Sequence, residues 1–361
     1  MMWRRFSLSA LSLVAGLLGC AALSYASDLQ QCETPTIGET QRFDACGRVE
    51  QDASALPRER ARALLQIGRM VQWQPQGIEK AISAWERAIA VDPTFVPAFV
   101  ARAEWFILYN KGDEAIRLLQ PVVVANPGEI DALVMIGRAY ASIGAFDQAL
   151  RSFDAALKLE PQNFKALSES GQVFEMIGDY AAAAKIYEKA GAIYDPSAVP
   201  ETGHGIENPY LAAARNYDRS GDVAKALSLI TLVIQEDLRN SFNFSVLEER
   251  ASYFEKLGQE SIAIADLTLA LENAPPNEQT HLLFKRAVLY QRQGKEQLAG
   301  EDFSKALGSG DRQAILRMQV YLRNQGFAEV EINGMTSSGL LKSISTCLAA
   351  VKCAAGLGKP I

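Results

Sequence analysis

Residues 130–163 read IDALVMIGRAYASIGAFDQALRSFDAALKLEPQN, and two helical patterns follow each other in them. Apolar and small residues recur at spacings of three and four from Leu133 to Tyr140, and again from Ala149 to Ala156. This spacing is typical of amphipathic helices. Gly144 stands between the two stretches and Pro161 follows the second, where a helix must end. The segment therefore predicts a pair of short helices joined by a tight turn.

The same pattern returns every 34 positions along the chain. Four series share this period: Ala81, Ala115, Ala149 and Ala183; Trp85, Leu119, Phe153 and Tyr187; Ala88, Val122, Ala156 and Ala190; and Pro93, Pro127 and Pro161. A repeat of this length indicates stacked helix pairs, because one pair cannot cover its own apolar face. The fold class predicted from the residues is all-α.

These recurring residues resemble the tetratricopeptide repeat family over about two thirds of the chain. The resemblance implies a right-handed superhelical solenoid of about seven helix pairs. The expected units are 62–95, 96–129, 130–163, 164–197, 207–240, 244–277 and 280–313, with a loop insertion at 198–206. Later turns carry Gly178, Gly221, Gly258 and Gly294, whereas the second unit has Asn110 there and Gly112 two residues on.

The first 26 residues have the features of an export signal. Arg4 and Arg5 precede an apolar stretch, and Ala26 ends a small-residue cleavage site, so the mature chain is expected to begin at Ser27 in the periplasm. Cys20 permits a second interpretation, in which it is the lipidated residue of a membrane-anchored lipoprotein. A retained anchor is disfavoured because the stretch is short for spanning a bilayer.

The other four cysteines form two close pairs at opposite ends of the mature chain. For an exported protein they predict the disulfides Cys32–Cys46 and Cys347–Cys353, with free buried thiols as the alternative. The second bond requires a break in the helix, because cysteines six apart on one helix are too distant. Neither spacing is that of zinc ligands, and the chain has 2 histidines, His204 and His281, so no metal site or cofactor is predicted.

Charge and motifs favour a binding protein over an enzyme. Loss of residues 1–26 removes Arg4 and Arg5 and no acid, so the net charge of −6 becomes −8. An acidic chain without a basic patch does not predict nucleic-acid binding. The sequence lacks GxSxG, HExxH, P-loop and GxGxxG motifs, and no catalytic residue is predicted.

In tetratricopeptide repeats the first helices line a binding groove, and the resemblance carries that role onto seven residues. Met70, Trp73, Val100 and Ile107 are expected to anchor apolar partner side chains, unless residues 39–53 fold back and cover them. Arg138, Lys165 and Arg215 are expected either to hold an anionic ligand or to be solvated charges. No unit has the lysine and asparagine of a carboxylate clamp, so acidic carboxy-terminal peptides are disfavoured.

After residue 313 the repeat stops. Gln319 and Leu322, the turn at Gly326 and Phe327, and Gly334 follow in an order that resembles the small helical peptidoglycan-binding domain. That family usually has aspartate at Asn333, and a Phe-Gln pair where Cys347 and Leu348 stand. Residues 314–361 are therefore either such a domain or a helical cap on the last repeat, as residues 27–61 are expected to cap the first.

Together these observations predict a non-enzymatic scaffold of the bacterial cell envelope that binds a protein or peptide in its groove. Two alternatives stay open. In one, the carboxy-terminal segment binds peptidoglycan. In the other, the chain is a lipoprotein accessory factor of an envelope assembly or secretion system, held at the membrane only if Cys20 is lipidated.

Overall fold

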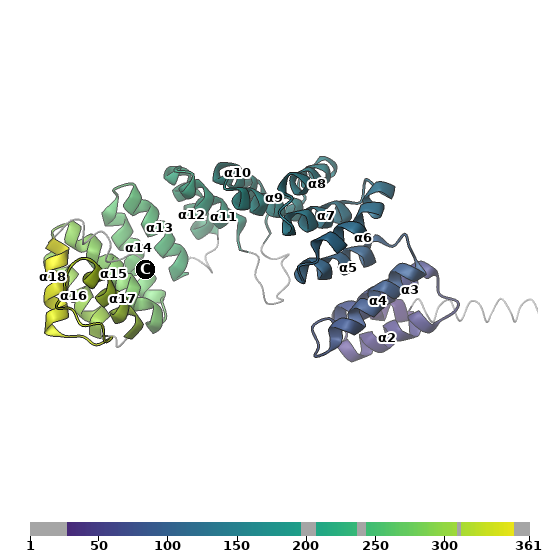
Figure 1. The fold of residues 1–361 in the computed structure, drawn as a ribbon, viewed down its shortest axis with the longest axis horizontal. Coiled ribbons are helices and arrows are strands. Elements are labelled where there is room, and N and C mark those ends of the chain that lie inside the picture. Colours follow the sequence, from purple (N-terminus) through teal and green to yellow (C-terminus); the bar gives the residue numbers. More distant parts are fainter. Residues whose placement is uncertain (1–26, 196–206, 237–242, 309–311, 350–361) are drawn as a thin grey trace, which may run out of the picture. The chain divides into compact units, whose positions relative to one another are not determined.

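The computed structural model describes residues 27–195, 207–236, 243–308 and 312–349. Within these ranges the chain forms helices and turns without strands, so the predicted all-α fold is confirmed. The chain divides into two compact bodies, an amino-terminal body of Met1–Ile177 and a carboxy-terminal body of Gly178–Ile361. Figure 1 shows helices paired side by side in both bodies. None of the described helices is long and apolar enough to cross a membrane.

The amino-terminal body consists of a short helical stretch at residues 27–33, a helix that precedes the repeats, three helix pairs and one further helix. These are α2 (Glu39–Gln51), α3 (Pro57–Val71) with α4 (Gly77–Val91), α5 (Val96–Leu108) with α6 (Gly112–Ala125), α7 (Ile130–Ser142) with α8 (Phe146–Leu159), and α9 (Phe164–Ile177). The first repeat helix begins at Pro57, ahead of the expected unit start at residue 62, because proline suits the first helical position.

The carboxy-terminal body continues the series with α10 and three more helix pairs, followed by two helices that lie beyond the repeats. These are α10 (Tyr180–Gly191), α11 (Pro209–Arg219) with α12 (Val223–Glu236), α13 (Phe244–Lys256) with α14 (Glu260–Asn273), α15 (Pro276–Arg292) with α16 (Glu296–Gly308), and then α17 (Arg312–Asn324) and α18 (Ser338–Ala349).

Each turn within a pair contains one residue in the left-handed backbone region. It is Gly144 in the third pair, with φ 77°, and a glycine stands at the same place in the later pairs. The second pair has Asn110 there, with φ 56°, and the first has Gln76, with φ 58°. We call this position the turn residue, and it places all the pairs in one register.

Small and large residues fit together between the two helices of a pair. A Cβ atom on Gly137 of α7 would lie 2.5 Å from the ring of Phe153 on α8, and one on Gly68 of α3 would lie 2.2 Å from Trp85 Nε1 on α4. Phe153 and Trp85 are almost fully buried. The alanine and aromatic series of the sequence are therefore the buried contacts of the helix pairs.

Candidate partner-binding surface

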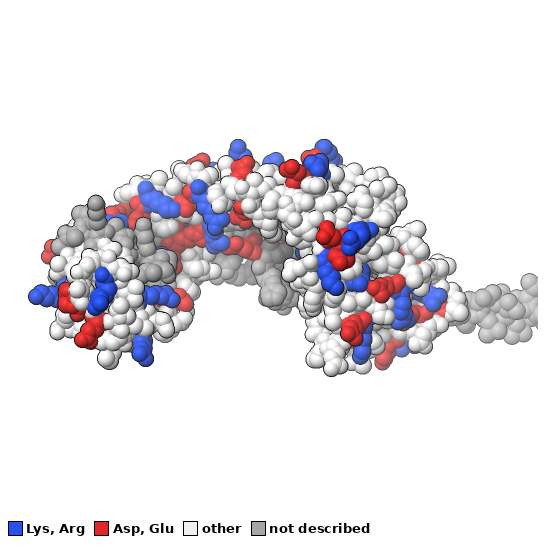
Figure 2. Space-filling model, in the orientation of Figure 1, with Lys and Arg blue, Asp and Glu red and all other residues white. Residues whose placement is uncertain are grey.

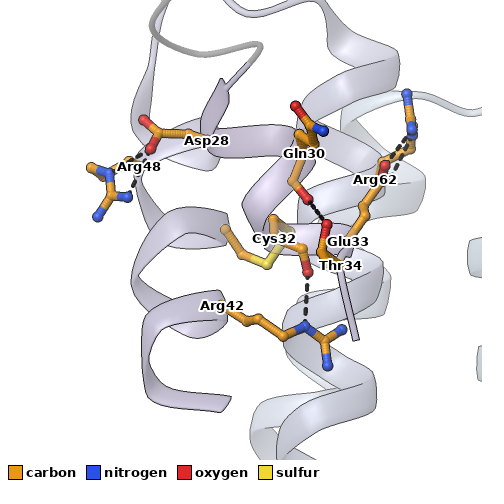
Figure 3. Close-up of a disulfide and its surroundings, with 9 residues drawn as sticks. Asp28, Gln30, Cys32, Glu33, Thr34, Arg42, Arg48 and Arg62 are labelled. Atoms are coloured by element: carbon orange, nitrogen blue, oxygen red, sulfur yellow. Dashed lines mark hydrogen bonds and ion pairs between the residues drawn. A yellow bond between two sulfur atoms is a disulfide. The ribbon is translucent and has the colours of Figure 1, made fainter. Parts of the chain in front are cut away.

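The amino-terminal segment folds back onto the first repeat. Cys32 and Cys46 form a disulfide that joins this segment to α2, as predicted. Figure 3 shows the polar contacts around it: Arg42 Nε donates to the Cys32 carbonyl at 3.1 Å, and Arg62 Nε of α3 donates to Glu33 at 2.7 Å. Both half-cystines are fully buried in an apolar cluster that also contains Ala63 of α3. The disulfide thus joins the segment to α2, and an ion pair and a shared core hold it to α3.

This segment covers part of the predicted apolar anchor. Met70 is partly buried against the disulfide cluster, which contains Cys46 and Val49 of residues 39–53. Trp73 lies beyond the end of α3 and is 78% exposed. Val100 and Ile107 of α5 are half-buried and pack beside Leu119, in the core between successive pairs. The four residues therefore do not form one continuous anchor site.

Two of the three predicted groove cations are already paired with carboxylates. Arg138 of α7 lies 3.2 Å from Glu104 of α5 and 3.1 Å from Glu169 of α9, so it links three successive first helices. Burial raises the pKa of Glu169, and the charge of Arg138 acts against that shift. Arg138 Nη1 donates to Glu104, and Glu169 lies within ion-pairing distance of Arg138 Nε, so two carboxylates offset its charge. The anion-binding interpretation of Arg138 stays a prediction, with two carboxylates already beside the guanidinium.

Arg215 has the same arrangement in the carboxy-terminal body. Its guanidinium forms hydrogen bonds to Glu249 of α13 at 3.0 and 3.1 Å and to Glu207 at its own helix start. Lys165 at the start of α9 is exposed. Figure 2 shows acidic and basic side chains side by side in the region that contains α11.

Ion pairs between the two helices of a pair, with buried aspartates, are a feature that the sequence interpretation missed. Arg250 of α13 forms two hydrogen bonds to Asp266 of α14, at 2.7 and 2.8 Å, and Arg286 of α15 does the same with Asp302 of α16. Both aspartates are buried. In each pair the arginine lies eight residues before the turn glycine and the aspartate eight after it. An arginine and an aspartate placed symmetrically about the turn glycine are therefore the sequence pattern from which these ion pairs could have been predicted.

Arg102 occupies the same register position in the second pair, but its partner is missing. Eight residues after Asn110 stands Leu118, so no acid faces the guanidinium from α6. Arg102 instead lies 4.0 Å from the centre of the Phe106 ring and donates to Glu86 of α4 at 3.1 Å. Its Nη1 is buried without a hydrogen-bond partner among the described residues.

The carboxy-terminal segment shares a core with the seventh pair. Leu322 of α17 and Leu340 of α18 are fully buried in one cluster with Phe303 of α16. Buried Gln319 fixes the connection between α17 and α18: its Oε1 accepts from the backbone N–H groups of Asn333 and Gly334, at 3.0 and 2.8 Å. Cys347 is buried in the same cluster, whereas Cys353, its predicted partner, lies outside the described residues.

The histidine within the described residues, His281, is paired with acids. His281 pairs with Glu248 at 3.1 Å and with Glu278 at 3.6 Å, and His204 lies outside the described ranges. In the described parts of the chain no three His, Cys, Asp or Glu residues are grouped as metal ligands.

Comparison with known proteins agrees with this repeat type over part of the chain. The sequence profile of the tetratricopeptide repeat matches residues 134–198. A crystal structure of MamA is 22% identical over 47% of this chain and 93% of its own, with a TM-score of 0.39. TTC0263, described as a thermophilic tetratricopeptide repeat protein of Thermus thermophilus, is 19% identical over 54% of this chain and 98% of its own, with a TM-score of 0.40. No curated protein matches the sequence.

Proposed function

We propose that this protein is a non-enzymatic scaffold that binds a protein or peptide partner along the wall formed by its first helices. The observation that carries the proposal is the internal pairing of Arg138 and Arg215. With these two arginines paired, the wall meets a partner through half-exposed apolar side chains such as Val100 and through exposed neutral ones such as Gln172. Such a surface suits shape and apolar recognition of a polypeptide more than capture of a small anion.

Site-specific photocrosslinking in intact cells tests this use of the wall. A benzophenone amino acid at Val100 or Gln172 is expected to give a discrete crosslinked product. The matched control is Lys158 on α8, whose side chain is 74% exposed and paired only with Asp154 of its own helix. Equal products from Lys158, or none from the wall positions, would contradict the proposal.

The cell envelope is the proposed location. The leader in residues 1–26 and the disulfide between Cys32 and Cys46 both support export, because such bonds persist in oxidising compartments. Mass spectrometry of the purified protein's amino terminus distinguishes the two export routes. A chain beginning at Ser27 indicates a periplasmic protein, and a lipidated Cys20 indicates the lipoprotein accessory factor. An unprocessed amino terminus on a reduced protein would refute export.

For residues 314–361 we propose a capping role, with peptidoglycan binding as the alternative. The cap is supported by the core that Leu322 and Leu340 share with Phe303. Because deletion would expose that core, co-sedimentation with cell-wall sacculi is best done with the full chain and with Ile332→Ser and Met335→Ser, whose side chains are exposed. Sedimentation that these changes abolish would favour the peptidoglycan-binding alternative, and absence of sedimentation would favour the cap.

A further inference from the structure

A row of exposed apolar side chains follows the turns of the amino-terminal body. Tyr109 and Ile143 directly precede their turn residues, and Ile177 ends α9 at the equivalent place. Leu108 and Met176 precede them and are 60% and 61% exposed. The turns of neighbouring pairs are adjacent, since a Cβ on Gly112 would lie 2.6 Å from Ile143 Cγ2. We call these five residues the apolar row.

A row of carboxylates follows the first three turns, so it overlaps the apolar row at the second and third turns. Glu79, Asp113 and Asp147 each stand three residues after a turn residue, in the first turn of α4, α6 and α8. All three are exposed, and within the described residues none of them forms an ion pair. We call them the acidic row. Carboxylates suit helix amino termini, but that preference alone does not explain why apolar side chains accompany them. Lys111, a cation at this edge, directs its ammonium toward the Trp105 ring, 5.7 Å away.

The corresponding edge of the carboxy-terminal body is built differently. Leu108 and Met176 lie two positions before their turn residues. At this position the three pairs of the carboxy-terminal body have Arg219, Lys256 and Arg292. Lys256 pairs with Asp218, and Arg292 lies 2.6 Å from Glu255 and 3.7 Å from Glu260, an acid in the first turn of α14. Three acids near this edge, Asp218, Glu255 and Glu260, thus pair with basic residues of the same body, whereas Glu79, Asp113 and Asp147 have no ion-pair partner among the described residues.

We propose that the apolar and acidic rows together bind an amphipathic helix of a partner protein, with basic residues flanking its apolar stripe. Packed helices lie about 8–10 Å apart, and seven residues of an α-helix advance about 10.5 Å. A partner helix with heptad-spaced apolar residues therefore places one of them at each successive turn, and its flanking lysines or arginines meet the acidic row. The basic residues that the carboxy-terminal edge supplies internally are here supplied by the partner.

This surface is distinct from the first-helix wall of the proposed function, so an experiment can contradict one proposal and leave the other standing. The probe is a peptide of about 20 residues with heptad-spaced leucines flanked by lysines, labelled for fluorescence anisotropy and titrated with residues 27–361. A peptide with glutamate in place of lysine is the charge control. A third peptide has the composition of the first but a non-amphipathic order.

The lysine peptide is expected to bind saturably, and the two controls are not. The double changes Leu108→Ser with Met176→Ser, and Asp113→Asn with Asp147→Asn, are each expected to weaken binding about tenfold or more. These side chains are exposed, so the fold is retained, which circular dichroism checks. The matched control Leu257→Ser, at the carboxy-terminal edge, is expected to leave binding unchanged.

Four results would overturn the proposal. One is equal binding of the glutamate peptide. Another is binding that Val100→Ser weakens and the edge changes do not, which would leave only the first-helix wall. Concentration-dependent dimers in sedimentation velocity, lost with Leu108→Ser, would identify a second copy as the occupant. Flotation with phosphatidylglycerol vesicles, lost with the same change, would identify a membrane.

Discussion

The second helix pair and the last two pairs place an arginine at the same position and use it in opposite ways. Arg250 and Arg286 pair with buried aspartates of the following helix, whereas Arg102 has Leu118 at the corresponding place and lies on the Phe106 ring. The residue sixteen positions later determines which arrangement forms. The repeat period therefore specifies where the arginine lies. The residue that faces it from the second helix specifies whether the arginine forms an ion pair or an aromatic contact.

The turn edges of the two bodies extend this comparison. The carboxy-terminal edge pairs Lys256 with Asp218 and Arg292 with Glu255, whereas the amino-terminal edge leaves Leu108 and Asp113 exposed. Helix packing does not require either composition, because edge side chains lie outside the core of the pairs. A difference that the fold does not demand is the kind of difference that binding explains.

Asp266→Ala is expected to have the largest effect, because it leaves the Arg250 charge buried without its partner. The loss should be about 3–5 kcal/mol in the unfolding free energy of the carboxy-terminal body. The matched control, Asp218→Ala, removes the partner of half-exposed Lys256 and should cost about 0–1 kcal/mol. Urea unfolding followed by circular dichroism measures both.

Tryptophan fluorescence supplies an internal reference for that experiment. Trp73, Trp85 and Trp105 all lie in the amino-terminal body, and the fourth tryptophan, Trp3, is in the leader. The fluorescence transition should therefore not move with Asp266→Ala. Equal losses for Asp266→Ala and Asp218→Ala would show that the buried pair is no more important than a surface contact.

Cys46→Ala is expected to act on the other body. Closing the Cys32–Cys46 loop, whose ends are 14 residues apart, stabilises a folded chain by about 3 kcal/mol in the chain-entropy model. The fluorescence transition should move to lower urea by a corresponding amount. The carboxy-terminal transition seen by circular dichroism should stay in place. A shift of both transitions together would mean that the bodies unfold as one unit.

Lowering the pH should have opposite effects on stability through two glutamates, Glu248 of the carboxy-terminal body and Glu169 of the amino-terminal body. Burial raises the pKa of Glu248, but the hydrogen bond to His281 and the charge of Lys285 outweigh it and lower the pKa from 4.5 to about 2. A carboxyl with a depressed folded pKa stabilises the protein above its unfolded pKa, and this contribution disappears as pH falls from about 5 through about 2. The contribution is about 3 kcal/mol at most.

Glu169 follows the reverse rule, because burial raises its pKa. Its protonated form is favoured by folding, so its contribution is present at low pH and is lost as pH rises through the folded pKa. Unfolding free energies of Glu248→Gln and wild type should therefore converge toward pH 2. Glu169→Gln should instead differ from wild type most at neutral pH. Parallel curves at either site would contradict the assignment.

Leu118→Asp tests whether the missing acid explains Arg102. The new carboxylate lies where Asp266 and Asp302 lie in their pairs, and the buried Arg102 Nη1 has no other partner among the described residues. The protein with Leu118→Asp should be more stable than the one with Leu118→Asn by about 1.5–3 kcal/mol, the contribution of a hydrogen bond between charged groups. In an Arg102→Ala background that difference should vanish.

The repeat was predictable because the contacts that build it are local and periodic. Ala149 and Phe153 recur because they pack inside each helix pair. Gly144 recurs because the turn needs a residue with positive φ. The state of Arg138 was not predictable in this way, since it depends on Glu104 and Glu169 in the neighbouring pairs. Exposure of Trp73 and burial of Met70 likewise depend on how the amino-terminal segment folds back.

Asn110→Gly is expected to have the smallest effect and the opposite sign. Asn110 holds φ at 56° where later pairs have glycine, and asparagine tolerates this region less easily than glycine. Glycine also gains entropy in the unfolded chain, which offsets part of the benefit. The amino-terminal body should therefore gain about 0.5 kcal/mol, seen as a small shift of the fluorescence transition to higher urea. The reciprocal change Gly144→Asn, in the next turn, should lose a similar amount. Losses from both changes would mean that the Asn110 side chain makes a stabilising contact of its own at the edge where Tyr109 and Lys111 are exposed.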